Sequence, residues 1–460
     1  MVLRHNCGLC VAHTLHDAYS FIKSLQHRGR EATGIAAIAN DRIDVIKWKG
    51  PVTRFDVIDL HKIFHSHDYH TFMAHVRYAT KGRKDRILED AHPHTIGGRV
   101  VDRGNHILIL GAEMAAVHNG QVNQEYLDAD VSCECDTATL LHLYRKKGEH
   151  EILRNIPGAY TIAIADTRKN HVAVLRDKSG IKPGCLGLKD RQYCIASEDI
   201  ALKKNGGEFI EDLEAGCIYY LSADGGYVHE KIIEPAIRHC FFEYNYLAHL
   251  DSIIDGISVR QVRQKLGKIL ADEFNPEDAE LVTFLPRCPE TAARVYKRET
   301  NKRLVPVFYK MHSERSFQGS TGNERRASID QNLHLIPGLD LEGKTIISID
   351  DSTVRGNNSK RARELLYEKA RVKKCYHANY TPPIGIIGKD GVARGCLFGV
   401  DMPPDDDFIA RGRSLDEISE AMQMPTVYIS VEGMLRAYEG LGLSRNNLCT
   451  YCIGGKHPFG

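Results

Sequence analysis

The stretch KTIISIDDSTVRGNNSKRARELL, from Lys344 to Leu366, decides the fold of the second half of the chain, because it runs from an apolar strand through a small-residue loop into a helix. The strand ends in two carboxylates, Asp350 and Asp351. Small residues let backbone N–H groups turn inward, and the helix N-terminus adds partial positive charge. The segment therefore predicts a binding site for a phosphate dianion. The residues of this predicted phosphate loop are Ser352, Thr353, Val354, Arg355, Gly356, Asn357, Asn358 and Ser359.

The two carboxylates beside the loop have two possible roles. They could accept hydrogen bonds from vicinal ribose hydroxyls, or they could face Mg²⁺. Their place also fits the rule that open parallel sheets bind ligands beyond the carboxyl ends of their strands. An acidic surface turn with a serine cap is the alternative for Asp350–Ser352 alone, but it explains the whole segment less well.

The sequence around this segment alternates between strands and helices. VRQVRQKLGKILADEF is an amphipathic helix, and the apolar runs ELVTFLP and LVPVFY follow it. This alternation is typical of a parallel sheet with helices on its faces. Before residue 230 short strands predominate, and ADTRKNHVAVL predicts a hairpin that turns at Arg168 to Asn170. We therefore expect a strand-rich domain over residues 7–235 and an α/β domain over residues 236–460.

Composition argues against several classes of partner. The 460 residues allow two or three domains, and 61 Lys and Arg nearly balance 60 Asp and Glu, which gives no electrostatic reason to expect nucleic acid or an anionic membrane. No apolar run approaches about 18 residues, and the start of the chain lacks a secretory pattern. Thirteen cysteines without an export signal fit a reducing compartment. We expect a cytoplasmic protein.

Two pairs of closely spaced cysteines need an explanation. MVLRHNCGLC places Cys7 and Cys10 three apart, and this pair could bind metal, form part of a disulfide framework, act as a redox pair or include a nucleophile. LCTYCIGGKHP places Cys449 and Cys452 in a C-x-x-C, which by itself suggests zinc, a redox pair or an iron–sulfur corner. Spacing alone does not decide between these alternatives.

The Lys344–Leu366 segment resembles the phosphoribosyl diphosphate (PRPP) signature of type I phosphoribosyltransferases, in the form found in the glutamine PRPP amidotransferase (amidophosphoribosyltransferase) family. The resemblance covers nearly the whole chain. It implies an α+β Ntn-hydrolase glutaminase domain with four αββα layers, followed by an α/β type I phosphoribosyltransferase domain. It also implies an enzyme that uses glutamine to convert PRPP to 5-phosphoribosylamine, with release of glutamate and pyrophosphate, in the first step of purine synthesis.

The resemblance assigns the nucleophile to Cys7, since NCGLCVAH is similar to the family's opening segment. The leader, residues 1–6, would be removed, and the free α-amine, with an unperturbed pKa of about 8, would serve as general base. Cys10 would pack in a strand. The other implied glutaminase residues are Arg28 and Arg77 for binding glutamine, Asn119 and Gly120 for the oxyanion hole, and Asp136 for the α-ammonium group.

In the transferase half, the resemblance implies that Asp350 and Asp351 bind the ribose hydroxyls, with Mg²⁺ carried on the pyrophosphate. The loop Ser352–Ser359 would hold the 5′-phosphate. Lys310 and Arg315 would clamp the pyrophosphate when a mobile loop closes over PRPP.

The transferase half also departs from the family pattern. The family's Asp-Ser-Gly loop is Arg287, Cys288 and Pro289 here, KMHSERSFQGS is tighter than the family's closing loop and lacks its tyrosine, and a Thr pair is replaced by Asn357 and Asn358. Arg287 could bind pyrophosphate directly, or it could mark a changed acceptor. Two alternatives therefore stay open: a glutaminase that supplies ammonia to another phosphorylated acceptor, and a PRPP- or nucleotide-sensing protein that has lost transferase activity.

Some members of the family carry a 4Fe–4S cluster, and its ligand contexts recur in this chain. The implied ligands are Cys240, Cys396, Cys449 and Cys452, the four thiolates that a cubane requires. Zinc on the same thiolates, or buried cysteines with a chance C-x-x-C, are the alternatives. The resemblance further implies a homo-oligomer, with purine nucleotides as possible inhibitors.

Overall fold

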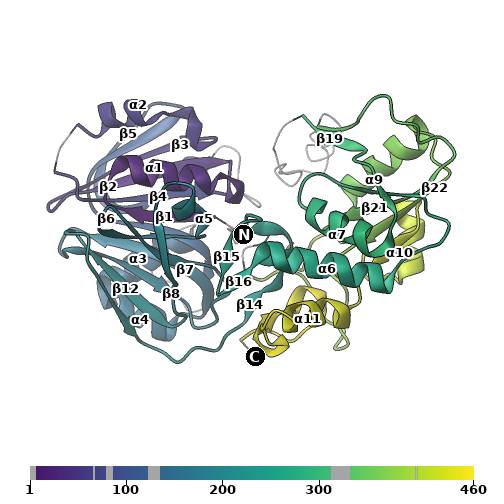
Figure 1. Cartoon of the computed structure of the whole chain (residues 1–460). Helices are drawn as coiled ribbons and strands as arrows, with labels where there is room; N and C mark the ends of the chain where they lie inside the picture. The colour runs from purple at the N-terminus through teal and green to yellow at the C-terminus, as the bar shows by residue number, and fades with distance from the viewer. Residues whose placement is uncertain are drawn as a thin grey trace.

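The computed structural model describes residues 7–459, except for residues 66–67, 79–85, 123–134, 312–331, 399 and 401. The described chain forms two bodies that lie side by side (Figure 1). The strands of the first body end at Lys231, and the first strand after them begins at His239. The predicted boundary between residues 235 and 236 lies in the segment that joins these strands.

Thirteen strands of the first body form one continuous sheet. Their bounds are β1 Gly8–Ala12, β2 Ala32–Ile38, β3 Ile43–Lys49, β4 Thr71–Arg77, β5 His94–Asp102, β6 His106–Val122, β7 Gly158–Asp166, β8 His171–Arg176, β9 Cys185–Lys189, β10 Gln192–Ala196, β11 Glu208–Asp212, β12 Cys217–Ser222 and β13 Tyr227–Lys231. Their order is β11-β9-β10-β1-β4-β2-β3-β6-β7-β8-β12-β13, with β5 also paired to β6. The hairpin predicted at Arg168 to Asn170 is confirmed, since β7 and β8 pair antiparallel.

Strand β6 belongs to both layers of this sheet and connects them. Its first part pairs with β3 and its last part, from Met114, pairs with β7. Gly111 lies where the pairing changes; its φ of 72° is a conformation that favours glycine, and its N–H donates to Asp44 at 2.7 Å. The residues near the end of β6 can therefore face β1 and β4 across the interior of the body.

Three separate apolar cores divide the first body into four layers. The helices of the outer layers are α1 Leu15–Ser24, α2 Val57–Ile63 and α5 Ile200–Lys203 on one side, and α3 Asp136–Lys147 and α4 Glu149–Asn155 on the other. One core contains Trp48 and packs beneath α1, a second contains Met73 and lies between the two halves of the sheet, and a third contains Leu140 of α3. The expected four-layer αββα arrangement is confirmed.

The second body is a parallel five-stranded sheet with helices on its faces. Its strands are β17 Leu281–Phe284, β18 Arg303–Leu304, β21 Thr345–Asp350, β22 Lys374–Asn379 and β23 Thr426–Tyr428, and its helices are α6 Val259–Glu273, α7 Glu290–Thr300, α9 Asn357–Glu364, α10 Leu415–Met422 and α11 Val431–Glu439. The order β18-β17-β21-β22-β23 reverses direction between β17 and β21. An open α/β sheet binds its ligands at such a switch point, beyond the carboxyl ends of the strands.

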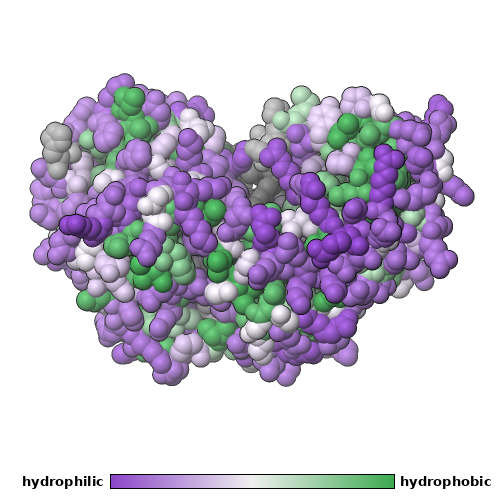
Figure 2. All heavy atoms as spheres, in the orientation of Figure 1, coloured by the Kyte–Doolittle hydropathy of each residue, from purple (hydrophilic) through white to green (hydrophobic). Residues whose placement is uncertain are grey.

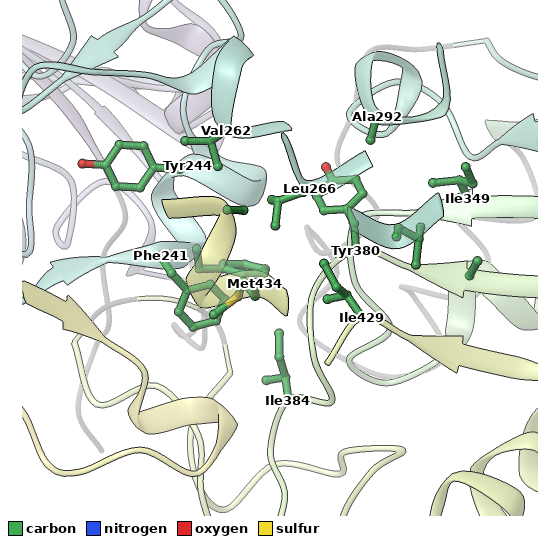
Figure 3. Close-up of a cluster of buried hydrophobic side chains, with 14 of the residues drawn as sticks. Phe241, Tyr244, Val262, Leu266, Ala292, Ile349, Tyr380, Ile384, Ile429 and Met434 are labelled. Carbon is green, nitrogen blue, oxygen red and sulfur yellow. The ribbon is translucent and has the colours of Figure 1, made fainter. Parts of the chain in front are cut away.

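Several short elements complete the structure, and some of them lie where the two bodies join. They are β14 His239–Cys240, β15 Ile253–Ile254, β16 Ile257–Ser258, β19 Phe308–Lys310, β20 Leu333–Leu335 and β24 Leu448–Cys449, the π-helical turns Glu243–Leu247 and Leu365–Lys369, and the 3₁₀ turns Gln26–Arg28, Val52–Arg54, Arg445–Asn447 and Tyr451–Ile453. Strand β14 pairs in parallel with β24, which brings the C-terminal segment back to the junction. Figure 3 shows Phe241 and Tyr244, which follow β14, in the same buried apolar cluster as Val262 of α6 and Met434 of α11.

The surface carries only scattered apolar residues on the face shown in Figure 2. Isolated exposed apolar side chains such as Val100 and Val228 are ordinary for a folded protein. Within the described ranges, no helix has the length and apolar character that crossing a membrane requires.

Candidate functional site

Cys7 lies just before β1 and is fully buried in the first body. Its backbone N–H donates to Asn119 Oδ1 at 3.1 Å, and its carbonyl accepts from Arg28 Nε at 2.9 Å. Burial raises the pKa of the Cys7 thiol to about 12, although the nearby charges of Arg77, Lys182 and Arg28 act in the opposite direction. At neutral pH this thiol therefore needs a base to remove its proton. Cys10 packs within β1, as expected.

The end of β6 places an unused donor beside Cys7. Asn119 is fully buried, and its Nδ2 finds no hydrogen-bond partner among the described residues. A buried amide without a partner costs free energy unless a ligand supplies one. The next residue, Gly120, has a φ of 134°, and a Cβ there would come within 2.0 Å of the Ala159 carbonyl oxygen. Only glycine fits this position, which directly follows the unused donor in β6.

Arg77 and Asp136 supply opposite charges near the same edge. Arg77 closes β4, is fully buried, and pairs with Glu31 at 2.9 Å and Asp90 at 3.4 Å. Its Nε has no partner among the described residues. Asp136 begins α3, where its Oδ1 accepts from Thr137 N at 2.8 Å. Burial raises the pKa of Asp136 to about 6, so it is ionised at neutral pH and lacks a full counter-charge.

Four buried histidines pack near Asp136, and sequence reasoning did not group them. His118 Nδ1 lies 3.0 Å from Thr137 Oγ1, and His75 Nε2 lies 3.0 Å from the His118 carbonyl oxygen. His92 stacks on His75 with ring centroids 4.2 Å apart and stands 4.7 Å from the ring of His94. Burial lowers the pKa of His75 and of His118 to about 3, so these rings are neutral and add no positive charge to the pocket.

Arg28, which the resemblance implies binds glutamine, has hydrogen bonds to protein groups. Its guanidinium donates to Glu198 at 2.5 Å and to Glu243 at 3.0 Å, besides the Cys7 carbonyl. All three side chains are buried. This placement favours a role in holding the Cys7 backbone. Sequence reasoning did not identify the two glutamates, because they come from separate segments and no pattern of neighbours shows that a carboxylate is buried.

A second group of side chains lies at the carboxyl ends of β17 and β21. Asp350 closes β21 and Asp351 follows it, and both are buried. Burial and the neighbouring charge of Asp351 raise the pKa of Asp350 well above its usual value, while Lys310 acts in the opposite direction. Two adjacent carboxylates of this kind repel each other, which penalises their joint ionisation. Their oxygens suit a hard cation or sugar hydroxyls.

The predicted phosphate loop turns from Asp351 into α9. Gly356 has a φ of 79° and immediately precedes the helix, so backbone N–H groups open toward the switch point. Thr353 uses its hydroxyl inside the body, donating to Asn379 at 2.7 Å with His377 Nε2 at 2.9 Å. Arg355 pairs with Asp406. These two side chains hold the loop, along with the Val354 carbonyl, which accepts from Ile409 at 2.9 Å.

The remaining predicted transferase residues lie partly within the described chain. Lys310 ends β19; burial lowers its pKa, the charges of Asp350 and Asp351 oppose that shift, and Arg287 adds to it. These four charged groups therefore share one region. Arg315 lies outside the described residues, whereas Cys288 lies 3.3 Å from the Tyr380 hydroxyl.

The four cysteines predicted as cluster ligands line one cavity at the junction of the two bodies, together with Phe242, Phe398 and Lys182. Burial raises the pKa of the Cys449 thiol to about 12. Within the described part of the chain, no three His, Cys, Asp or Glu side chains are grouped so as to hold a metal ion. A cubane places its own irons between the thiolates, so its ligands need not converge on one point. The four cysteines are Cys240, Cys396, Cys449 and Cys452.

Comparisons with known proteins cover nearly the whole chain. A family model described as a glutamine amidotransferase domain matches residues 58–224. An amidophosphoribosyltransferase of Methanocaldococcus jannaschii is 30% identical, over 96% of this chain and 93% of that protein, and one of Archaeoglobus fulgidus is 30% identical, over 96% and 94%. Among solved structures, glutamine PRPP amidotransferase from B. subtilis, complexed with ADP and GMP, matches with a TM-score of 0.79 and 26% identity, covering 98% of this chain and 97% of that one.

Proposed function

Since this chain belongs to the amidophosphoribosyltransferase family, we propose that it takes ammonia from glutamine and transfers it to PRPP, giving 5-phosphoribosylamine, glutamate and pyrophosphate. This reaction is the first step of purine synthesis. One observation carries the proposal: a single chain combines a buried thiol beside an unused amide donor with an acid pair and a glycine-opened loop at a sheet switch point. The first arrangement suits release of ammonia from an amide, and the second suits a sugar phosphate.

The glutaminase site matures when residues 1–6 are removed, which frees the α-amine of Cys7. That amine takes the thiol proton, and the thiolate attacks the carboxamide carbon of glutamine. The oxyanion accepts hydrogen bonds from Asn119 Nδ2 and the Gly120 N–H. The α-ammonium group of Cys7 returns the proton to the leaving nitrogen as the C–N bond breaks and ammonia leaves, and water then hydrolyses the thioester to release glutamate. Arg77 binds the α-carboxylate of glutamine, and Asp136 binds its α-ammonium group.

The transferase step takes place at the carboxyl ends of β17 and β21. Ammonia attacks the anomeric carbon of PRPP and pyrophosphate leaves. Asp350 and Asp351 bind the ribose hydroxyls, and the loop Ser352–Ser359 holds the 5′-phosphate. Lys310 and Arg315 clamp the pyrophosphate. Mg²⁺, when bound with the pyrophosphate, supplies positive charge to the leaving group and balances the two carboxylates.

Arg287 gives the transferase site a further cation. It replaces an acidic residue of the family pattern, and its charge lies close enough to Lys310 to lower the pKa of that lysine, after burial. We propose that Arg287 contacts the pyrophosphate directly. If it does, the site binds pyrophosphate with less dependence on Mg²⁺ than the family's acidic loop would allow.

A 4Fe–4S cluster is part of the proposal, with Cys240, Cys396, Cys449 and Cys452 as its thiolates. When bound, it would supply a structural cross-link between the junction strand β14 and the C-terminal segment. The support for it is the shared cavity, with apolar neighbours that would shield a cluster from solvent.

Regulation and location complete the proposal. We expect purine nucleotides to inhibit the enzyme, since the related protein from B. subtilis was solved with ADP and GMP bound. We also expect a homo-oligomer in the cytoplasm. The described cysteines are all free thiols, which suits a reducing compartment.

The test is an anaerobic assay of the full chain with glutamine and PRPP. We expect glutamate and pyrophosphate in equal amounts, and mass spectrometry should show that the mature chain begins at Cys7. Glutamate without pyrophosphate would instead indicate another phosphorylated acceptor. Binding of PRPP or purine nucleotide without any turnover would indicate a sensing protein.

A further inference from the structure

Lys182 is a buried lysine in the turn between β8 and β9, and no step of the proposed mechanism uses it. Its side chain is 1% exposed, and its Nζ lies 3.9 Å from Glu243 Oε1. A buried ammonium is costly unless carboxylates or other anions compensate it. The environment of Lys182 should therefore show what it compensates.

On one side, Lys182 faces the chain of contacts that ends at Cys7. Glu243 belongs to the second body and accepts from Arg28 Nη2 at 3.0 Å and from Nη1 at 3.2 Å. Arg28 in turn donates from Nε to the Cys7 carbonyl at 2.9 Å. Each of these side chains is buried. The position of Glu243 thus sets the position of Arg28, and Arg28 holds the backbone of the proposed nucleophile.

On the other side, Lys182 lines the cavity of the four cysteines. Cys240 of that cavity precedes Glu243 by three residues in the chain. Lys182 therefore faces both Glu243 and the cavity of the four cysteines from the first body.

We propose that Lys182 is a positioning residue shared by the glutaminase site and the cysteine cavity. Its ammonium fixes Glu243, and through Arg28 the Cys7 backbone, while it offsets the negative charge of the thiolates that hold the cluster. This inference rests on the proposed function, since it assumes both the Cys7 nucleophile and the cluster. It makes the reactivity of Cys7 and the retention of iron depend on one side chain.

The test compares four variants of the full chain, purified without oxygen. Lys182→Met removes the charge, Lys182→Arg keeps it, Glu243→Gln breaks only the branch toward Cys7, and Lys178→Met removes an exposed lysine from the same turn as a control. Three quantities are measured: iron retained per chain during air exposure, the rate at which a glutamine-like diazoketone alkylates Cys7, and pyrophosphate release with ammonium chloride in place of glutamine.

Lys182→Met should lose iron about 10- to 100-fold faster than wild type, as for other residues that support a metal site. The alkylation of Cys7 in this variant should be about 10- to 100-fold slower than in wild type. Lys182→Arg should recover most of both. Glu243→Gln should slow labelling about tenfold but keep iron within about twofold of wild type. Lys178→Met should match wild type, and ammonia-dependent pyrophosphate release should be preserved in all four variants.

Several outcomes would overturn the inference. If Lys182→Met loses iron but labels at the wild-type rate while loaded, Lys182 serves the cluster alone. If it labels slowly but keeps its iron, it serves Cys7 alone. Loss of ammonia-dependent activity in parallel would mean general destabilisation. Failure of the proposed function would look different: wild type would then release no pyrophosphate with glutamine, while iron retention and labelling still report on Lys182.

Discussion

The two proposed sites differ in how completely the protein balances their charges. At the glutaminase site, cations and carboxylates are paired before any ligand arrives: Arg28 bonds Glu198 and Glu243, and Arg77 pairs with Glu31. At the transferase site, two neighbouring carboxylates are buried together, and the pKa of Asp350 is raised well above its usual value by burial and by that neighbour. The first site is therefore organised in advance, whereas the second is completed by the charges of its substrate and cation.

The contrast follows from the elements that build each site. Cys7, Arg77 and Asn119 lie in or next to β1, β4 and β6 of one sheet, where hydrogen bonds between neighbouring strands fix the backbone. The transferase residues lie in loops that leave the ends of parallel strands, where the sheet no longer fixes the backbone. A loop site can adapt to a ligand. When the ligand is absent, its neighbouring carboxylates repel each other.

The largest effect should separate the two sites altogether. Cys7→Ala removes the only proposed nucleophile, so glutamine-dependent pyrophosphate release should fall by at least about 10⁴-fold. Release with ammonium chloride should persist, because the transferase site does not use the thiol. Parallel loss of both activities would show that the sites are not independent, and Cys10→Ala, which changes a buried cysteine of the strand that follows Cys7, is the matched control.

A smaller loss should follow from removal of the unused donor. Asn119→Ala should lower kcat for glutamine hydrolysis by about 10²- to 10³-fold, which is the usual cost of losing one oxyanion donor. The KM for glutamine should change little, because the donor acts on charge that develops in the transition state. A rise in KM at constant kcat would instead make Asn119 a substrate-binding residue. Steady-state glutaminase assays distinguish these outcomes.

The paired charges of the first site predict a loss of stability when one partner is neutralised. Glu198→Gln leaves Arg28 with a weakened partner in a buried setting, so the free energy of unfolding should fall by about 3 kcal/mol. Arg28 and neighbouring His27 hold the pKa of Glu198 well below its usual range against the effect of burial. This contribution is therefore present above the unfolded-state pKa of about 4 and is lost as pH falls below it. Chemical denaturation at pH 7 and pH 3 measures both values.

The neighbouring acids of the second site predict a change of the opposite sign in the free energy of unfolding. Asp350→Asn removes one of two neighbouring buried carboxylates, so the free energy of unfolding at pH 7 should rise by about 1 kcal/mol while PRPP turnover falls. Because the folded-state pKa is raised, the ionised carboxyl is penalised at neutral pH and the gain should vanish below about pH 4, where both states are protonated. Destabilisation by Asp350→Asn at pH 7 would remove the contrast between the sites.

The sequence predicted those features of the molecule that depend on neighbouring residues. The strand, loop and helix of Lys344–Leu366 are contiguous, so their pattern indicated both the parallel sheet and the position of Asp350 at its edge. The family resemblance then indicated the residues around Cys7. Neither source indicated the continuous sheet path through β6, because it depends on long-range pairing and on the change of pairing near Gly111.

The buried ion network was also beyond sequence reasoning. Glu198, Glu243 and Lys182 come from three segments whose local patterns do not mark them as buried, and only the packing of the two bodies brings them together. Arg28 was identified as a site residue, but its bonds to the two glutamates were not predicted, because a motif shows that a residue matters and not which atoms it touches. The same limit applies to Thr353 and Arg355, whose side chains hold the phosphate loop from within.

The smallest predicted effect tests whether the first site is balanced throughout. Burial raises the pKa of Asp136 to about 6, so the carboxylate that should bind the α-ammonium group is half protonated at that pH. Binding of glutamine to the Cys7→Ala variant, measured by calorimetry, should therefore strengthen about twofold between pH 6 and pH 7.5, as the ionised fraction rises from about one half to nearly one. In Asp136→Asn binding should be weak and independent of pH over this range. If instead the Cys7→Ala variant, with Asp136 intact, binds glutamine equally well at both pH values, Asp136 has a counter-charge in place. The charges of the glutaminase site are then balanced at this position too.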